Sequence, residues 1–525
     1  MSVFAYMPYG AGGIIIRVET DIRRGIPGVD ISGLAEGAVR EARDRVRAAF
    51  RNSGFNFPVD RILINLAPAG LKKEGAALDL PIALSIMAAA GIVPISGNLL
   101  VMGELELSGR IRPVRGVLAA IAAGLEQGIN EFIVPAENAG EAAILASARF
   151  TAVENLQNAV HALFIREEKG KLPISLETAK VQKTENTYGD FFDVCGQEIY
   201  KRALEIAAAG GHNVLVFGPP GAGKTLLARR MPSIMAPLSA SEAIEVTRLH
   251  SLAGPHLNNG GFIDQLITSP PFRAPHHCAS AEGILGGGKF LRPGEISLAH
   301  YGVLFLDEAP EFKINVLQAL REPLEDRVIS IVRADGPVHL PAEFQLLMAA
   351  NPCRCGRLGM RDNESTCLCS SEEINRYWRK FSGALLDRVE IRIAVLPPDV
   401  KEMSKKKSIE NNENSAVIAH RVKTAVDIQR CRFKETAIRR NALIPAGKAA
   451  EMCPMNEKAE NAFHAAISKL GLSGRAYHGI LRVARTIADL ESKEIIETVH
   501  ILEAVQYRRL GEDPWDILSL NTIST

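Results

Sequence analysis

Hydrophobic and polar positions divide the chain into three blocks with different periodicities. The first block, residues 1–165, mixes β-rich runs (14–18, 61–66) with helical runs (35–50, 80–90, 116–124), which predicts an α+β or α/β domain. In the second block, 188–396, apolar runs at 213–217, 303–306 and 345–349 alternate with helical segments, a pattern typical of a parallel sheet. The third block, 416–525, is helical, with apolar residues at helical spacing through 480–490.

Two polar stretches separate these blocks. Residues 166–187 are rich in Lys, Glu and Thr, and residues 397–415 contain a lysine run and an asparagine-rich run. Low hydrophobicity combined with high charge does not support a packed core. We therefore predict linkers at both stretches and a multi-domain α/β protein.

Composition changes this picture only slightly. The 525 residues are 47% hydrophobic and 23% charged, with a formal net charge of +1, so a nucleic-acid-binding surface would have to be local or created by assembly. No apolar run reaches the roughly 18 residues of a membrane span, and the N-terminus lacks a signal-peptide pattern. We expect a cytoplasmic protein with no membrane partner. Its eight cysteines are then expected to be thiols or metal ligands.

A glycine-rich loop follows the apolar run 213–217 and precedes a helical segment. It matches the phosphate-binding pattern GxxxxGK[ST] in the required strand–loop–helix setting. Backbone N–H groups wrap the phosphates, Lys224 neutralises their charge, and Thr225 supplies an oxygen to Mg²⁺. The sequence therefore predicts that Mg-ATP is bound by Gly218, Pro219, Pro220, Gly221, Ala222, Gly223, Lys224 and Thr225.

Two further apolar runs end in residues suited to ATP hydrolysis. Asp307 follows the run 303–306 and is predicted to hold Mg²⁺, and Glu308 is predicted to polarise the attacking water. Asn351 follows the run 346–350 and either orients that water or merely turns the chain before Pro352.

Together with further segments, these residues resemble the AAA+ ATPases, and within them the Mg-chelatase-like proteins of ComM/YifB type in the helix-2-insert group. The resemblance covers nearly the whole chain and is carried by 269–280 (SPPFRAPHHCAS), 294–308 (GEISLAHYGVLFLDE), 351–356 (NPCRCG), 382–388 (SGALLDR) and 472–478 (LSGRAYH). It implies an α/β ATPase core at 188–396, a C-terminal helical lid at 416–525, and a homo-hexameric ring.

The resemblance also assigns two arginines. Arg388 looks like the arginine finger that reaches the γ-phosphate of the neighbouring subunit. Arg475 looks like the sensor-2 arginine of the lid, although Arg482 and Arg485 follow on the same helix and compete for that role. A guanidinium is a rigid, permanently charged fork that suits phosphate.

Two inserts are expected to face the channel of such a ring. The segment 327–340 has a hairpin pattern with Asp335-Gly336 at its turn, and a second insert between Phe272 and His300 carries a glycine-rich run. Basic residues of the two inserts either contact a nucleic-acid backbone or are solvated tips; they are Lys289, Arg292 and Arg333. His276 and His277 are expected to support the fold or the site rather than to bind a metal.

Four cysteines form a CxC…CxC pattern: Cys353, Cys355, Cys367 and Cys369. Four thiolates from one short loop would close around a structural Zn²⁺, although C-x-C is tighter than the common zinc spacing. The alternative is four loop cysteines without a metal.

The first block resembles the proteolytic domain of Lon. Residues 73–80 resemble the loop that holds the nucleophilic serine there, and residues 103–118 resemble the segment that ends at the catalytic lysine. In this register Ala77 stands at the serine position and Leu118 at the lysine position. A Ser–Lys dyad needs a hydroxyl and an amine, so we expect no peptidase activity. The block is then a platform for assembly or for DNA binding.

Three functions remain open at this point. The resemblance favours a hexameric, ATP-driven DNA motor for helicase action or branch migration during recombination or natural transformation. A chelatase motor subunit is disfavoured by the Lon-like block and by the lack of a DxSxS metal site. A protein-remodelling ATPase is the third alternative.

Overall fold

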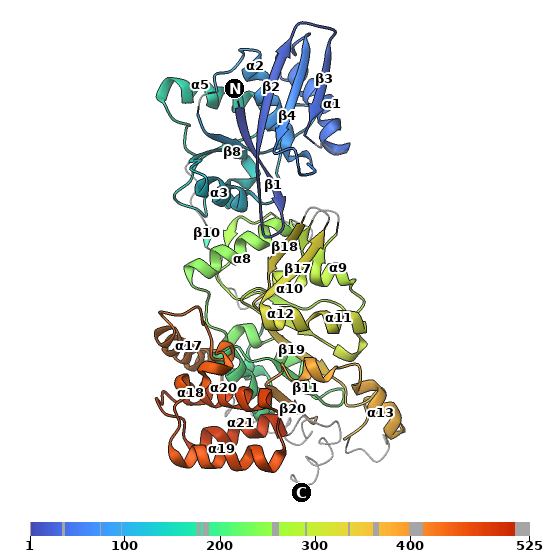
Figure 1. Cartoon of the computed structure of the whole chain (residues 1–525), viewed down its shortest axis with the longest axis vertical. Helices are drawn as coiled ribbons and strands as arrows, with labels where there is room; N and C mark the ends of the chain where they lie inside the picture. Colours follow the sequence, from blue (N-terminus) through green and yellow to red (C-terminus); the bar gives the residue numbers. More distant parts are fainter. Residues whose placement is uncertain are drawn as a thin grey trace.

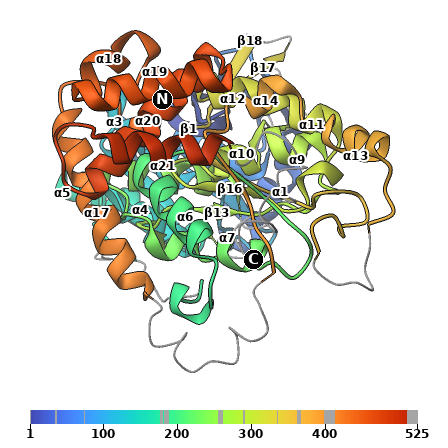
Figure 2. The same cartoon turned by 90° about the horizontal axis from the view of Figure 1, so that it is seen from below.

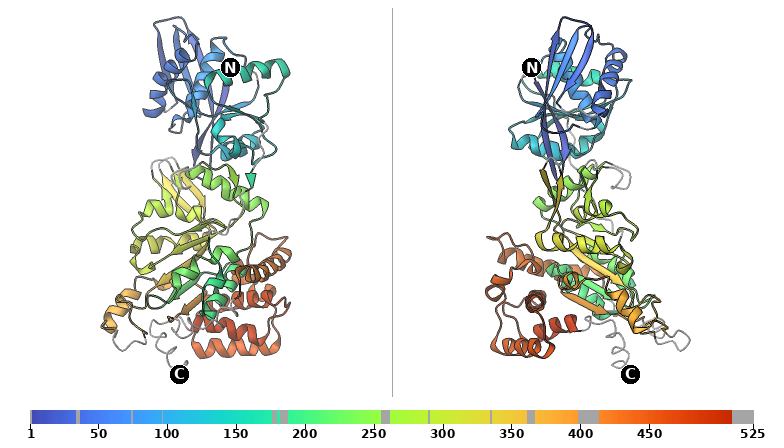
Figure 3. Two further views of the ribbon diagram at one scale, coloured as in Figure 1. Left: turned by 180° about the vertical axis from the view of Figure 1, so that it is seen from behind. Right: turned by 45° about the vertical axis from the view of Figure 1, so that its right-hand side comes forward.

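The computed structural model describes residues 2–33, 37–73, 75–95, 97–175, 180–181, 188–254, 262–288, 291–333, 336–360, 367–397 and 413–509. The molecule is elongated, with the N-terminal block at one end and the α/β block in the middle (Figure 1). The C-terminal helices lie beside the part of the α/β block farthest from the N-terminal block (Figure 3). Among the described helices, none combines the length and apolar character that a membrane crossing needs.

A seven-stranded mixed sheet forms the N-terminal block, in the order β3-β4-β2-β1-β5-β8-β9. The β1–β2 and β2–β4 pairs are antiparallel, whereas β1, β5, β8 and β9 pair in parallel. Alternate residues of β4 are buried, because successive side chains of a strand point to opposite faces. The strands are β1 (Ser2–Tyr9), β2 (Gly12–Arg23), β3 (Gly28–Ser32), β4 (Arg61–Ala67), β5 (Leu99–Val101), β8 (Glu131–Pro135) and β9 (Arg149–Val153).

The helices of this block are α1 (Gly37–Asn52), α2 (Asp79–Ala89), α3 (Val117–Glu126), α4 (Ala139–Ala142) and α5 (Leu156–Lys169). Helix α2 is buried almost throughout, including Asp79. Its carboxylate is met by Arg45 of α1 through two hydrogen bonds of 2.8 and 3.0 Å. The predicted strands and helices of this block are confirmed. Helix α5 continues through Lys169, so the first residues of the predicted linker are helical; residues 176–179 and 182–187 of that linker lie outside the described ranges.

A five-stranded parallel sheet forms the core of the α/β block, in the order β13-β16-β19-β11-β20. Every residue of the four longer strands is buried, which is typical of a parallel sheet covered on both faces. The strands are β11 (Val214–Phe217), β13 (Phe272–Arg273), β16 (Val303–Leu306), β19 (Gln345–Ala350) and β20 (Ile391–Ala394). The predicted parallel sheet is therefore confirmed.

The helices of this block are α6 (Glu198–Gly210), α7 (Lys224–Ala228), α8 (Ala240–Ala253), α9 (Ala281–Leu285), α10 (Glu295–Leu298), α11 (Ile314–Ala319), α12 (Arg321–Asp326), α13 (Ser371–Trp378) and α14 (Gly383–Leu386).

Both predicted inserts are present and are joined to each other. The hairpin of β17 (Val328–Arg333) and β18 (Gly336–Pro341) precedes β19. A short antiparallel pair, β14 (Gly286–Gly287) and β15 (Arg292–Pro293), lies between α9 and α10. Arg333 donates a hydrogen bond to the carbonyl of Gly288 and so links the two inserts. Arg292 is half-buried, so it is not a solvated tip. Lys289 and the turn residue Asp335 lie outside the described ranges.

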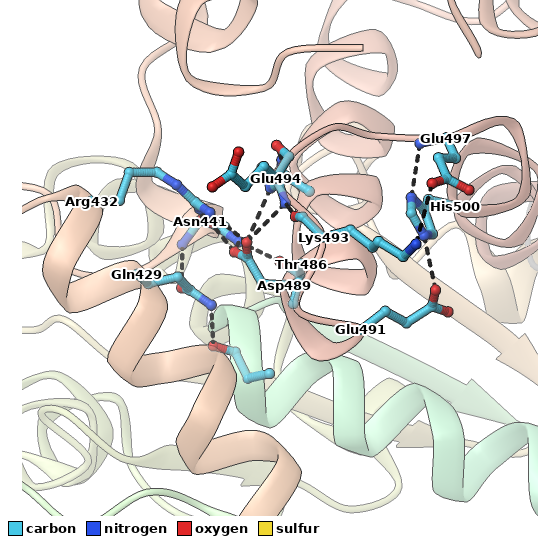
Figure 4. Close-up of polar contacts among 12 residues, drawn as sticks. Gln429, Arg432, Asn441, Thr486, Asp489, Glu491, Lys493, Glu494, Glu497 and His500 are labelled. Carbon is cyan, nitrogen blue, oxygen red and sulfur yellow. Dashed lines mark hydrogen bonds and ion pairs between the residues drawn. The ribbon is translucent and has the colours of Figure 1, made fainter. Parts of the chain in front are cut away.

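Through residue 509 the third block is helical, as expected, and residues 510–525 lie outside the described ranges. The block lies on one side of the α/β block, with α13 on the other side (Figure 2). Its helices are α17 (Ser415–Arg432), α18 (Ala449–Met452), α19 (Glu457–Leu470), α20 (Gly474–Leu490) and α21 (Thr498–Arg509). A buried carboxylate ties α17 to α20: Asp489 accepts hydrogen bonds from Arg432 Nη1 (2.8 Å) and Asn441 Nδ2 (2.7 Å) (Figure 4). It also accepts one from Arg485 Nε (3.1 Å). Most of the second predicted linker, 398–412, lies outside the described ranges.

The C-terminal end of α8 joins the α/β block to the N-terminal block. Leu252 is 1% exposed and belongs to the same apolar cluster as Tyr6 and Phe132 of the N-terminal sheet. Next to it, the hydroxyl of Ser251 donates a hydrogen bond to Glu141 of α4. A second contact lies at the β1–β2 turn, where Gly10 abuts Val338 of the β17–β18 hairpin.

Glu141 is the buried polar centre of this joint. Its carboxylate also accepts hydrogen bonds from the N–H of Leu118 at 2.7 Å and from Asn138 at 3.1 Å. Burial nevertheless raises the pKa of Glu141 from 4.5 to about 7. The folded protein therefore holds this proton more tightly than the unfolded chain does.

We predict that Glu141 weakens the fold as pH rises. Below pH 4.5 both states are protonated; between pH 4.5 and 7 the unfolded state releases the proton first, so stability is lost, and above pH 7 the loss is complete at roughly 3 kcal/mol. Because Glu141→Gln never ionises, its stability relative to wild type should rise by about 2–3 kcal/mol between pH 5 and pH 8. Urea unfolding at both pH values measures this difference. The exposed Glu137→Gln is the matched control, and a pH-independent difference for Glu141→Gln would contradict the prediction.

Candidate nucleotide site

The predicted phosphate-binding loop connects the end of β11 to the start of α7. Gly221 and Gly223 have φ values of +81° and +78°, which residues with a β-carbon rarely adopt, and nothing lies within 4 Å of where their side chains would project. Glycine is therefore required at both positions by the backbone conformation and not by a lack of room for a side chain. The loop leaves backbone N–H groups and the N-terminus of α7 at one place, an arrangement that suits phosphate.

Lys224 lies inside this loop. Its ammonium donates hydrogen bonds to the carbonyls of Gly218 (2.6 Å) and Pro219 (2.9 Å) and to Oδ1 of Asn351 (3.2 Å). Burial lowers the pKa of Lys224 to about 8, although Asp307 and Glu308 act in the opposite direction. Phosphate oxygens would favour the charged form of this amine, as expected for a residue that binds the β- and γ-phosphates.

Thr225 and Asp307 form the candidate magnesium site. The hydroxyl of Thr225 donates a 2.9 Å hydrogen bond to Oδ2 of Asp307, which follows the last residue of β16. A hydroxyl oxygen and a carboxylate at this separation are ligands that Mg²⁺ accepts while it keeps several waters and binds phosphate oxygens. The residues present therefore fit the ion that the sequence predicts.

Glu308 is directed away from the fold and toward His277. Its backbone has a positive φ of 50°, its side chain is 56% exposed, and its Oε2 lies 3.8 Å from Nδ1 of His277. His277 follows β13, and the parallel β13–β16 pairing brings the segment after β13 to the same edge as Glu308. The sequence pattern did not identify this contact. The pairing of the two strands was the missing information.

Asn351 is brought to this edge by the register of β19. Phe217 pairs with Ala350 and Leu306 pairs with Met348, so the residues that follow all three strands meet. The amide of Asn351 reaches Lys224, which favours a role at the γ-phosphate over a simple turn before Pro352.

The two predicted arginines lie elsewhere, in a cleft of about 440 Å³ between the α/β block and the helical block. Arg388 donates a 2.6 Å hydrogen bond to the carbonyl of Ala384 and also contacts Glu325. Arg475 is exposed at the start of α20. The cleft is lined by five arginines and four carboxylates: Arg327, Arg388, Arg475, Arg482, Arg508, Glu325, Glu343, Asp387 and Glu390.

This arginine cleft and the phosphate-binding loop lie at opposite edges of the sheet. Asn213 and Phe344, which line the cleft, precede β11 and β19, whereas the loop and Asn351 follow those strands. The six residues of β19 span about 20 Å. Neither arginine therefore serves the phosphate-binding loop of its own chain in this structure.

The competing lid arginines differ in environment. Arg485 is 1% exposed and is bonded to Asp489 and to the carbonyls of Lys493 and Glu494, so its role is to hold the lid together. Arg482 is half-buried and lines the arginine cleft. Arg475 remains the exposed member of the three.

The four cysteines of the CxC…CxC pattern meet in the loop between β19 and α13. Their sulfur atoms all lie within 4.8 Å of one another. His276, His277 and Cys278 form a second group at this spacing, but His276 and Cys278 are exposed. His276 is therefore not a core residue, and its neighbour His277 supports Glu308.

Comparison with known proteins agrees with this geometry. Family models described as "Magnesium chelatase, subunit ChlI" and "Magnesium chelatase, subunit ChlI C-terminal" match residues 190–404 and 412–508. The chain is 40% identical over 514 residues to Competence protein ComM of Haemophilus influenzae, covering 97% of both chains. It belongs to the Mg-chelatase-like AAA+ family. It is also 39% identical to protein YifB of Escherichia coli over 94% of both chains.

Membership in this Mg-chelatase-like AAA+ family implies ATPase activity with ATP and Mg²⁺. A third family model, "Subunit ChlI of Mg-chelatase", matches residues 18–138. The same block is 25% identical to Lon protease of Solibacter usitatus over 134 residues, which is 24% of this chain and 17% of that protein. The Lon resemblance of the N-terminal block thus has modest support, and a model named after a chelatase matches the same block.

The residues at the Lon-like positions are packed rather than open. Leu118 is fully buried at the start of α3, and Ala77 is half-buried in the turn that directly precedes α2. Neither side chain carries a nucleophile or a base. The absence of peptidase activity stays a prediction.

We predict that Glu308→Gln abolishes ATP turnover without abolishing ATP binding. Loss of the group that polarises water should lower the turnover rate roughly 10²–10⁴-fold. Lys224→Ala should instead lose ATP binding, since it removes the cation of the loop. Steady-state phosphate release and binding of a fluorescent ATP analogue separate the two effects. Glu311→Gln, an exposed change close by in the chain, is the control; full turnover by Glu308→Gln would rule out the assigned role.

Proposed function

We propose that the protein is a ring-forming AAA+ ATPase of the helix-2-insert group, most simply a homo-hexamer, that moves DNA. The position of the arginine cleft is the observation that supports assembly into a ring. Arg388 and Arg475 cannot reach the phosphates of their own chain, whereas a head-to-tail contact would bring the cleft of one subunit to the loop of the next. The helix-2-insert assignment is supported by the β14–β15 pair between α9 and α10.

The proposed site takes its parts from two subunits. One subunit supplies the phosphate-binding loop, with Mg²⁺ at Thr225 and Asp307, the base Glu308 and the amide Asn351. The neighbour supplies Arg388 to the γ-phosphate and Arg475 to the same nucleotide. Hydrolysis then depends on assembly, because the arginines neutralise charge that develops on the transferred phosphate. The other resident ion that we propose is a structural Zn²⁺ at the four cysteines.

DNA is the proposed track, in branch migration or unwinding during recombination or natural transformation. The name of the Haemophilus relative associates that protein with competence. In this chain β17 of the hairpin ends in Val332, which is 81% exposed, and Arg333. A ring would gather several copies of Arg333, so a chain with a net charge of +1 can still present a local positive surface.

A chelatase motor is the second candidate, because all three matched family models carry that name. Protein remodelling is the third. The three functions differ in the ligand that stimulates ATP turnover, and this difference decides among them.

A mixing experiment tests the shared site. Glu308→Gln and Arg388→Ala should each be inactive, but a ring assembled from equal amounts should regain about a quarter of wild-type turnover, since one interface in four pairs an intact base with an intact arginine. Mixing Glu308→Gln with Lys224→Ala is the control. Both defects lie in the half of the site that supplies the phosphate-binding loop, so every interface keeps a defective half and no turnover should return. If the mixture of Glu308→Gln and Arg388→Ala showed no ATP turnover, Arg388 would be assigned to the site of its own subunit.

DNA stimulation tests the track. Forked DNA and four-way junctions should raise ATP turnover and yield unwound or migrated products, whereas porphyrin and unfolded protein should not. Arg333→Ala should need a higher DNA concentration for half-maximal stimulation, with Lys458→Ala on the exposed face of α19 as the matched control. A hexameric preparation that no DNA stimulates would sink the proposal, and stimulation by porphyrin or unfolded protein would select one of the alternatives.

A further inference from the structure

Four cysteine sulfur atoms lie close enough together to share one metal ion. The S···S distances are 3.3 Å for Cys353–Cys355, 3.5 Å for Cys355–Cys367 and 3.6 Å for Cys353–Cys367, and the sulfur of Cys369 lies within 4.8 Å of the other three. A disulfide needs about 2.05 Å between sulfurs. A tetrahedral ZnS₄ centre with Zn–S bonds of about 2.3 Å has S···S edges of about 3.8 Å. The observed distances are therefore too long for disulfides and close to the edges of such a metal centre.

The loop that carries these cysteines is shaped to bring them together. The first pair directly follows Asn351-Pro352, and the second pair directly precedes Ser370, which caps α13. Gly356 and Gly359 have positive φ values of 75° and 84°, so the chain turns back sharply after the first pair. Cys353 is fully buried, which also protects the cluster from one side. A closed set of four protein ligands is typical of a structural rather than a catalytic site.

The same loop touches the nucleotide site on two sides. Cys353 lies two residues after Asn351, whose amide meets Lys224 at 3.2 Å. On the other side, Gly356 packs against Pro220 of the phosphate-binding loop so closely that a β-carbon there would lie 3.0 Å from Pro220 Cδ. The cluster is thus attached both to the amide that senses the phosphate and to the loop that binds it.

Helix α13 contacts both the start of the cysteine loop and the end of β11 through Trp378. The indole N–H of Trp378 donates a 2.9 Å hydrogen bond to the carbonyl of Pro352. Its ring makes an edge contact with Phe217, the last residue of β11, at a centroid separation of 5.1 Å. The two ends of the cysteine loop are therefore held to the same strand from which the phosphate-binding loop leaves.

We propose that Cys353, Cys355, Cys367 and Cys369 bind one Zn²⁺ ion, and that the metal-closed loop holds Asn351 and Pro220 in place for ATP hydrolysis. The metal supplies structure and takes no part in the reaction. Binding of zinc does not depend on the DNA-motor proposal, whereas the effect on hydrolysis rests on the assigned nucleotide site.

Metal content tests the first half of the proposal. Full-length protein purified without chelators should contain one zinc per chain by elemental analysis, and Cys355→Ser and Cys369→Ser should each reduce it at least tenfold. Cys431→Ser, an exposed cysteine on α17, is the matched control and should keep its zinc. A wild-type chain that stays metal-free after zinc supplementation would overturn the site, and bound iron, which an S₄ site also accepts, would overturn the choice of metal.

The rate of hydrolysis tests the second half. Cys355→Ser should lower kcat for ATP about tenfold while KM changes less, because a displaced Asn351 impairs the chemical step more than phosphate binding. Circular dichroism and the oligomeric state should match wild type; if Cys355→Ser does not fold, release of zinc from wild-type protein by a mercurial and its return with thiol and zinc replaces the variant. Zinc loss with unchanged kcat would overturn the bracing role while leaving the metal site intact. An absence of DNA stimulation would leave both results unaffected.

Discussion

The nucleotide site depends on one constraint, the parallel pairing of β19 with β11 on one side and with β16 on the other. Parallel strands start at one edge of a sheet and end at the other, so the register Phe217–Ala350 places the phosphate-binding loop beside Asn351. The neighbouring pair Leu306–Met348 brings Asp307 to the same edge. The residues that precede these strands, which line the arginine cleft, must then lie at the opposite edge of the sheet. One register thus decides which residues a chain brings to the phosphate-binding loop, and it underlies the proposed sharing of the site between two subunits.

The N-terminal block is attached to parts of the ATPase that lie close to this site in the chain. Helix α8 follows the phosphate-binding loop and α7, and its end carries Ser251 and Leu252 into the N-terminal core. The β17–β18 hairpin precedes β19 and meets the β1–β2 turn at Gly10. The N-terminal block therefore rests on the hairpin that we propose for DNA contact, which places this block at the same end of the molecule as the proposed track.

Much of the fold followed from the sequence because its signals are local. Strand and helix periodicity located the sheets, and the glycine-rich loop was specific enough to predict a nucleotide site whose residues Lys224, Thr225 and Asp307 lie together in the structure. Contacts between distant segments did not follow. His277 beside Glu308 depends on the β13–β16 pairing, and Glu141 beside Ser251 depends on how two blocks dock, neither of which leaves a periodic signal. The half-buried state of Arg292 is likewise not a local signal, because its strand β15 lies against α8, a segment distant in the chain.

The surroundings of Leu118 restrict what can replace it. Its backbone N–H is bonded to Glu141, its side chain is fully buried, and Gly116 beside it packs against Leu252 of the ATPase block. A lysine at position 118 would have to bury its amine or displace the side chains that cover Leu118. Because these residues also form the joint with α8, a change at position 118 would be felt in the ATPase block as well as in the N-terminal fold.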